Sequence, residues 1–106
     1  MTRVIDMTPD DVAAALEAGT ITLVDVREDH EYAAEHIAGA VHLPLSRFDL
    51  AALPNDPDRP VVFQCHLGGR SARAVMYCAQ QGLPIDSHLA GGIDAWKAAG
   101  LPTVKP

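Results

Sequence analysis

One segment near the middle of the chain combines a cysteine with a glycine-rich turn and a positive charge. It follows the apolar run 61–64 and reads Cys65-His66-Leu67-Gly68-Gly69-Arg70-Ser71. Gly68 and Gly69 allow the backbone to turn several N–H groups toward one point, and the helix expected next adds unpaired N–H groups of its own. Such a cup, together with the charge of Arg70, stabilises a thiolate and any negative group bonded to its sulfur. The segment therefore predicts Cys65 as a nucleophile.

The remaining side chains of this segment have several roles open to them. Arg70 could bind an anionic substrate or stabilise a leaving anion, because its planar fork suits oxyanions. Ser71 could cap the following helix or offer its hydroxyl to the sulfur. His66 is next to Cys65, but adjacent loop residues often point in different directions, so we expect it on the rim. Leu67 is expected to line the mouth of the site.

The composition restricts the classes of protein to which the chain can belong. Its 106 residues suit a single domain, 1–106, and an apolar share of 48% suits a packed core rather than disorder. The net charge of −6 disfavours nucleic acid as a partner, because phosphate binding needs a basic face. No uncharged apolar stretch is long enough for a membrane span. Acidic residues at 6, 10 and 11 lie where a signal peptide needs apolar ones, so we expect a cytoplasmic protein.

The cysteines and histidines show no pattern of metal ligands. Cys65 and Cys78 are thirteen residues apart, and there is no second pair of cysteines. The following histidines have no ligand-like spacing to them: His30, His42 and His88. We therefore expect no zinc. In a reducing compartment both thiols should be free, and Cys78 is expected to pack within a helix interface.

Strand-like and helix-like segments alternate along the chain. Apolar runs predict strands at 4–5, 21–26, 41–43, 61–65 and 87–89. Capping signals and apolar spacing predict helices between Thr8 and Gly19, at 28–35, after Ser46, at 71–81 and at 93–99. In the last two helices, the residues expected to face the core are Ala72, Val75, Met76, Ala79 and Trp96. This order is typical of an α/β fold with a mostly parallel sheet and helices on both faces. Cys65 then lies at the carboxyl edge of the sheet, where ligands bind.

Three ordered motifs resemble the rhodanese-like sulfurtransferases. The segment 65–70 fits the family's Cys-x-x-Gly-x-Arg loop. Residues 23–27, followed by Glu31-Tyr32 and 36–40, are similar to its first signature, and residues 89–96 are similar to its closing signature. The resemblance covers nearly the whole chain and implies the single-domain form, with a five-stranded, mostly parallel sheet. In this family Asp25, Arg27 and His36 belong to the scaffold.

The resemblance also implies the chemistry. The Cys65 thiolate would attack the outer sulfur of thiosulfate or of a persulfide-like donor, and sulfite or a thiol would leave. Cys65 would then carry a persulfide, held by the loop of residues 66–71. A thiol or cyanide would remove the sulfur, so no cofactor is needed beyond this covalent intermediate.

Two other interpretations remain beside this one. The chain could be a persulfide carrier that delivers sulfur to a partner enzyme, because an intact loop serves both tasks. It could also be a cysteine phosphatase or an arsenate reductase, which share a related fold. These use five residues between cysteine and arginine, whereas four lie between Cys65 and Arg70 here, which favours sulfur chemistry.

Overall fold

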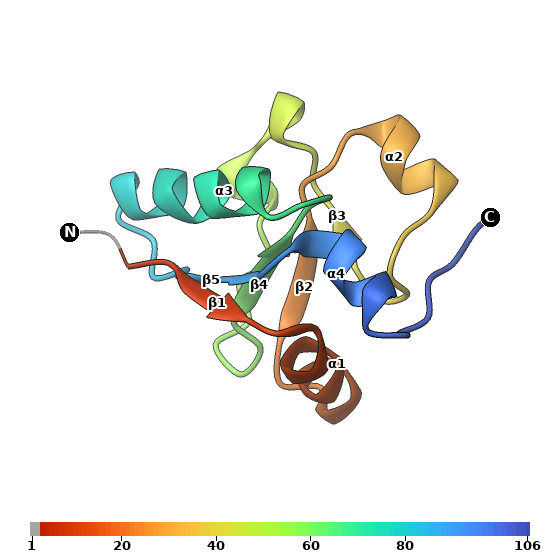
Figure 1. Ribbon diagram of the computed structural model, residues 1–106. Coiled ribbons are helices and arrows are strands. Elements are labelled where there is room, and N and C mark those ends of the chain that lie inside the picture. The colour runs from red at the N-terminus through yellow and green to blue at the C-terminus, as the bar shows by residue number, and fades with distance from the viewer. Residues whose placement is uncertain (1–2) are drawn as a thin grey trace.

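The computed structural model describes residues 3–106, and its centre is a sheet of five parallel strands in the order β1-β5-β4-β2-β3 (Figure 1). The strands are β1 (Ile5–Met7), β2 (Thr22–Asp25), β3 (Val41–His42), β4 (Val61–Gln64) and β5 (Ser87–Leu89). The two most buried strands, β2 and β4, pair with each other in the middle, as expected for strands covered on both faces. The predicted α/β fold with a parallel sheet is confirmed.

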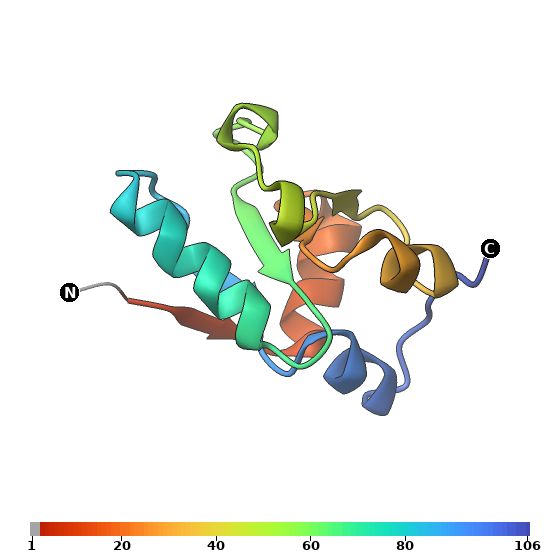
Figure 2. The same cartoon turned by 90° about the horizontal axis from the view of Figure 1, so that it is seen from above.

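Helices cover both faces of this sheet (Figures 1 and 2). They are α1 (Pro9–Ala18), α2 (Asp29–Ala34), α3 (Gly69–Gln80) and α4 (Gly92–Ala98). The first helix begins and ends as its sequence predicts. Thr8 and Asp11 form a reciprocal capping box, and Gly19 ends the helix in the left-handed conformation with φ of 70°. None of the helices among residues 3–106 is long and apolar enough to cross a membrane.

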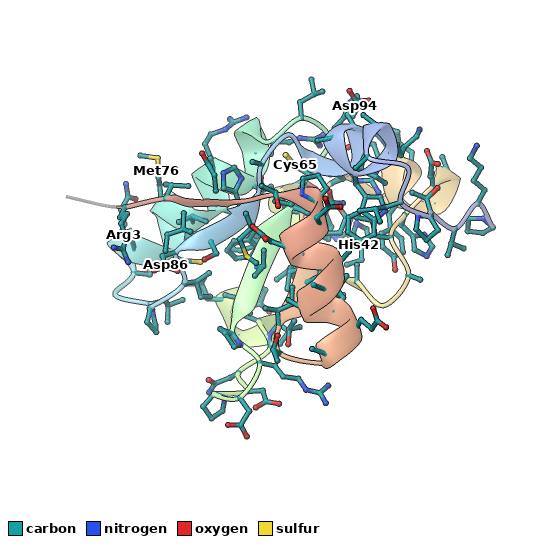
Figure 3. The ribbon with its side chains drawn as sticks, turned by 60° about the horizontal axis from the view of Figure 1, so that its bottom comes forward. Arg3, His42, Cys65, Met76, Asp86 and Asp94 are labelled. Atoms are coloured by element: carbon teal, nitrogen blue, oxygen red, sulfur yellow. The ribbon has the colours of Figure 1, made fainter. Side chains whose placement is uncertain are left out.

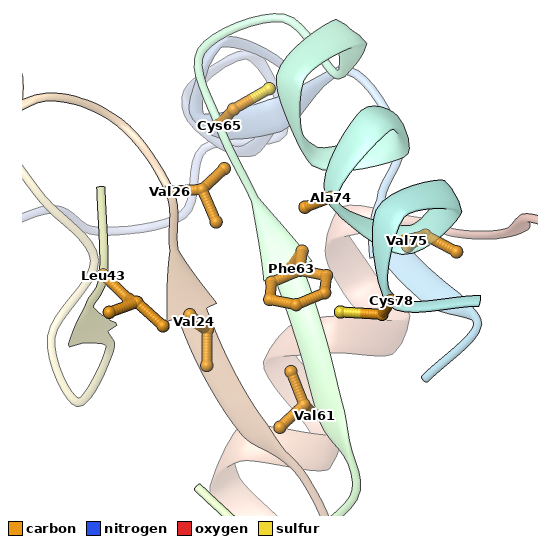
Figure 4. Close-up of a cluster of buried hydrophobic side chains, with 9 residues drawn as sticks. All are labelled: Val24, Val26, Leu43, Val61, Phe63, Cys65, Ala74, Val75 and Cys78. Atoms are coloured by element: carbon orange, nitrogen blue, oxygen red, sulfur yellow. The ribbon is translucent and has the colours of Figure 1, made fainter. Parts of the chain in front are cut away.

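Alternation along the central strands divides the core into two clusters. Val61, Phe63 and Cys65 point toward α3, where they meet Ala74 and Cys78 (Figure 4). The cluster on the opposite face contains Val12, Leu23, Ile37, Val62, Leu89, Ile93 and Trp96, from α1, α4 and the strands between. Cys65 is thus the last member of an apolar column, at the carboxyl end of β4. A packed column beneath the sulfur leaves little freedom for its position.

Three expectations about the helices need correction. The helix expected after Ser46 is two short 3-10 turns, Leu45–Arg47 and Leu50–Ala52, because Asp49 caps a new turn through the Ala51 N–H. The helix expected from Ser71 begins at Gly69. Its buried face is formed by Ser71, Ala74, Val75 and Cys78, while Met76 is 47% exposed. The helical spacing was therefore right, but the face is rotated by one residue.

Candidate active site

The sulfur of Cys65 lies directly beyond the carboxyl end of β4, against the first turn of α3 (Figure 4). The residue is only 1% exposed. Its Sγ accepts a hydrogen bond from the Gly68 N–H at 3.1 Å and lies 3.5 Å from the Ser71 hydroxyl. The structure thus brings the predicted nucleophile to the positive end of a helix of 12 residues.

The two thiols differ in their tendency to ionise. Burial opposes the thiolate of Cys65, but hydrogen bonds from the Ser71 hydroxyl and from the backbone N–H groups of Ser71, Gly68 and Arg70 outweigh it, so its pKa lies below the ordinary value. At Cys78 burial acts alone and raises the pKa. Both thiols are free, and Cys78 packs inside the apolar column, as expected (Figure 4).

The turn of the loop depends on Gly68. Its φ is 107°, and a Cβ at this position would lie 3.2 Å from the Gly91 nitrogen. A side chain would therefore be strained by the backbone and crowded by the segment before α4. The glycine lets its own N–H point at the sulfur while the chain enters α3.

The start of α4 fixes the outer side of the loop. The carbonyl oxygens of Cys65 and His66 accept hydrogen bonds from the N–H groups of Ile93 and Asp94, at 2.8 and 3.1 Å. Gly92 lies so close that a Cβ on it would overlap the Cys65 carbonyl oxygen. Because α4 binds these carbonyls, they point away from the sulfur, and the face of the loop toward the sulfur consists of N–H groups.

Arg70 is held by a residue for which the sequence alone indicates no role. Its two terminal nitrogens bind the two carboxylate oxygens of Glu31 on α2, at 2.7 and 2.8 Å. This hydrogen-bonded pairing lowers the pKa of Glu31 to about 2, against the opposing effect of burial. Glu31 also accepts the Glu28 N–H, so α2 and the loop that contains Cys65 and Arg70 are joined through one carboxylate. The acidic residue was visible in the first motif, but nothing in its spacing connects it with Arg70.

Ser71 links the sulfur to His88, a histidine for which the sequence predicts no role at the site. The buried Ser71 Oγ lies 2.7 Å from His88 Nδ1 and 3.1 Å from the Gly68 carbonyl oxygen. On its other side, His88 Nε2 lies 2.7 Å from Asp6 Oδ1. Nothing in the position of His88 along the chain connects it with Cys65; the connection depends on the packing of α3 against β5, which pairs with β4.

The mouth of the site is formed by the two side chains between Cys65 and Gly68. Leu67 is 65% exposed, and the half-exposed His66 ring lies 4.0 Å from the carboxylate of Asp94. Cys65 and Asp94 lie at the same end of the molecule, away from Arg3 and Asp86 (Figure 3). His66 and Leu67 are therefore exposed, as expected for residues on the rim of the site.

The other motif residues support the scaffold. Arg27 forms a buried two-pronged ion pair with Asp25 and also donates to the Glu35 carbonyl oxygen at 2.7 Å. His36 Nδ1 lies 2.9 Å from the carbonyl oxygen of Tyr32. These contacts hold α2 in place, and with it Glu31. Within residues 3–106, no three histidine, cysteine or acidic side chains gather as metal ligands would.

Comparison with known proteins identifies the family of the chain. Residues 8–99 match the model of the family described as "Rhodanese-like domain". A protein of Allochromatium vinosum named "Sulfurtransferase" is 40% identical over 86 residues, which cover 81% of this chain and 80% of that protein. An uncharacterized Synechocystis protein, slr1261, is 39% identical over 95% of this chain, and the chain spans 56% of its length.

Among solved structures, the crystal structure of a rhodanese-related protein from Thermoplasma volcanium superposes with a TM-score of 0.78 at 33% identity. The alignment covers 96% of this chain and 97% of that one. The family match spans all the elements of the site from Cys65 to α4. With its parallel sheet, its cysteine loop and these relatives, the chain belongs to the rhodanese-like domain family.

Proposed function

We propose that this protein is a sulfurtransferase that moves a sulfane sulfur from thiosulfate or a persulfide donor to a thiol or cyanide acceptor, through a persulfide on Cys65. The observation that carries the proposal is the cup of N–H groups around the buried thiol of Cys65, which lowers the pKa of that thiol. The name of the Allochromatium relative supports the same chemistry. We also propose a cytoplasmic location, where both thiols would stay reduced.

The reaction has two displacement steps. In the first, the Cys65 thiolate forms a bond to the outer sulfur of thiosulfate, the sulfur–sulfur bond of the donor breaks, and sulfite leaves with the electron pair. In the second, an acceptor thiolate or cyanide attacks the terminal sulfur of the persulfide, and the Cys65 thiolate leaves. The N–H groups of Gly68, Arg70 and Ser71 face negative charge on sulfur in both steps and stabilise it.

The role of Arg70 follows from its pairing. Glu31 neutralises the charge of the guanidinium and occupies both terminal nitrogens. An anionic donor must therefore share the fork with Glu31. We propose that Arg70 contributes to donor binding in this shared state, while the loop amides hold the transferred sulfur.

The test is the intact mass of the protein after incubation with thiosulfate and removal of excess reagent. We expect one added sulfur, located on the Cys65 peptide and removed by cyanide. Cys65→Ser should gain none, while Cys78→Ser should gain as much as the wild type. An unmodified wild-type protein with thiosulfate and with a low-molecular-weight persulfide would overturn the proposal.

A second candidate function is supported by the exposure of Leu67. A large apolar side chain that is 65% exposed beside the sulfur suits contact with a protein acceptor. In that case the protein would be a persulfide carrier, with slow turnover of thiosulfate and cyanide but rapid transfer to a partner enzyme. Leu67→Ser distinguishes the two, because it should slow transfer to a protein acceptor and leave transfer to cyanide unchanged. Phosphatase and arsenate reductase activities are disfavoured by the four-residue spacing of the loop.

A further inference from the structure

A continuous chain of hydrogen-bonding side chains runs from the surface to the sulfur. Asp6 and His88 are direct register partners on β1 and β5, and their side chains meet at 2.7 Å. His88 Nδ1 lies 2.7 Å from Ser71 Oγ, which lies 3.5 Å from Cys65 Sγ. The His88 side chain is only 6% exposed, whereas that of Asp6 is 70% exposed.

The order of donors and acceptors follows from the exposed end. The Asp6 carboxylate only accepts, so His88 Nε2 carries a hydrogen and donates it. In a neutral ring Nδ1 is then an acceptor, and the Ser71 hydroxyl donates to it. The Ser71 oxygen in turn accepts the hydrogen of the Cys65 thiol. In this state both ring nitrogens of His88 and the Ser71 hydroxyl have a hydrogen-bond partner.

The same groups can also stabilise the thiolate form of Cys65. The thiol hydrogen passes to Ser71 Oγ while the hydroxyl hydrogen passes to His88 Nδ1, so one S–H bond breaks and one N–H bond forms. His88 is then an imidazolium between Asp6 and Ser71, and the Ser71 hydroxyl donates to the thiolate. The net charge of these four side chains does not change, because the thiolate and the imidazolium arise together.

We propose that His88, oriented by Asp6, accepts the proton of Cys65 through Ser71 and thereby sets the population of reactive thiolate. His88 and Asp6 are positioning residues in this scheme, since each acts on the sulfur through another side chain. The catalytic meaning of the relay rests on the sulfurtransferase function proposed above. The proton transfer itself involves only groups of this chain and can be measured without a sulfur donor.

The surroundings of His88 leave few other partners for its ring. Its register neighbour on β4 is Phe63, and the nearest loop backbone is that of Gly68, where an added Cβ would lie 3.8 Å from His88 Cε1. Among the described residues, the charged or titratable groups linked to the ring are Asp6 directly and Cys65 through Ser71. Ser71 lies closer to His88 than to the competing Gly68 carbonyl oxygen, at 2.7 against 3.1 Å.

The first test is the rate of Cys65 alkylation by iodoacetamide as a function of pH, read by peptide mass. His88→Asn keeps an amide near Nδ1 but cannot take a proton, so we expect alkylation near neutral pH to slow by about tenfold. Asp6→Asn should slow it by a smaller factor, and Ser71→Thr, which keeps the hydroxyl, should slow it less than Ser71→Ala. A folded His88→Asn with the wild-type pH profile would overturn the proposal.

The matched control is Asp10→Asn, which removes the same charge from another exposed carboxylate, on the first turn of α1. Its Cys65 alkylation profile should equal that of the wild type. Asp6 is mostly exposed, so Asp6→Asn is expected to fold even if a change at the buried His88 is not tolerated. An equal slowing in Asp6→Asn and Asp10→Asn would show a general charge effect and count against the relay.

The second test observes His88 by NMR. If thiolate and imidazolium form together, the two titrations are coupled. In Cys65→Ser the anion cannot form, so the His88 ring resonances should titrate at lower pH than in the wild type. Identical titrations would overturn the relay. If the coupling is found but no sulfur is transferred, the relay stands and the proposed function fails, so the two failures are distinguishable.

Discussion

Arg70 and Glu31 form a two-pronged ion pair that joins the first turn of α3 to α2, with nitrogen–oxygen distances of 2.7 and 2.8 Å. The pair places a carboxylate beside the site of a reaction whose proposed donor is an anion. It holds the guanidinium in place and at the same time reduces its attraction for thiosulfate. Which effect dominates can be read from kinetics with charged and neutral donors.

We expect Arg70→Ala to reduce kcat/KM for thiosulfate by about 30- to 150-fold, the equivalent of one charge-assisted contact of roughly 2–3 kcal/mol. With a neutral persulfide donor, kcat/KM should fall much less. Arg70→Lys should retain only part of the wild-type kcat/KM for thiosulfate, because lysine lacks the planar fork. Glu31→Gln should preserve or increase kcat/KM for thiosulfate, since it frees the fork. Equal losses on both donors in Arg70→Ala and Glu31→Gln would show that the pair supports the loop rather than the donor.

The ion pair between Arg70 and Glu31 makes the free energy of unfolding depend on pH in the acid range. The folded pKa of Glu31 is about 2, below its ordinary 4.5, so its stabilisation is fully present above 4.5 and is lost as the pH falls toward 2. Glu31→Gln should therefore lower the free energy of unfolding near neutral pH, by about 1–2 kcal/mol after allowance for solvent screening. The difference from the wild type should shrink in urea titrations at increasingly acid pH. Glu17→Gln, at an exposed position of α1, is the charge-matched control and should show no such trend.

The two cysteines should be alkylated in different pH ranges. The pKa of Cys65 is lowered by hydrogen bonds that outweigh burial, while burial raises that of Cys78. In the folded protein Cys65 should react with iodoacetamide at a pH where Cys78 does not. In urea the two rates should become equal, because both effects require the fold. If Cys65 and Cys78 showed the same pH dependence of alkylation in the folded protein, the hydrogen bonds of the loop would not stabilise the Cys65 thiolate.

Substitution of Gly92 should impair persulfide formation as strongly as a substitution within the loop of residues 65–71. Its φ is 61°, and a Cβ would overlap the carbonyl oxygens of Cys65 and His66. We expect Gly92→Ala to displace the loop and to abolish persulfide formation. Gly39→Ala is the control, because Gly39 also has a positive φ, 86°, but a Cβ added there would meet no atom within 4 Å. It should cost about 1–2 kcal/mol of stability and leave sulfur transfer intact. Full activity in Gly92→Ala would show that α4 does not fix the loop.

Features encoded by neighbouring residues could be predicted from the sequence. The capping box of Thr8 and Asp11, the strand before Cys65 and the glycine-rich entry to α3 depend on residues a few positions apart. The contacts of the site that were missed join distant segments. Glu31 and Arg70 are 39 residues apart, and Asp6 and His88 are 82 apart. Their meeting depends on the strand order, which places β1 beside β5 for Asp6 and His88, and β2 beside β4 for the helices that carry Glu31 and Arg70. The exposure of Met76 cannot be predicted from the helical spacing alone, because the rotation of α3 is set by the strands beneath it.

The backbone contact between Gly92 and Cys65 has a consequence for protein engineers. Two backbone hydrogen bonds join the loop to the start of α4, and the two backbones lie so close that a methyl group at Gly92 would overlap the loop. Residues 65–71 and 91–94 therefore form one exchangeable module, although they lie on separate stretches of the chain. Grafting either stretch alone into another scaffold should give a misfolded loop, and grafting both should carry the cup with it.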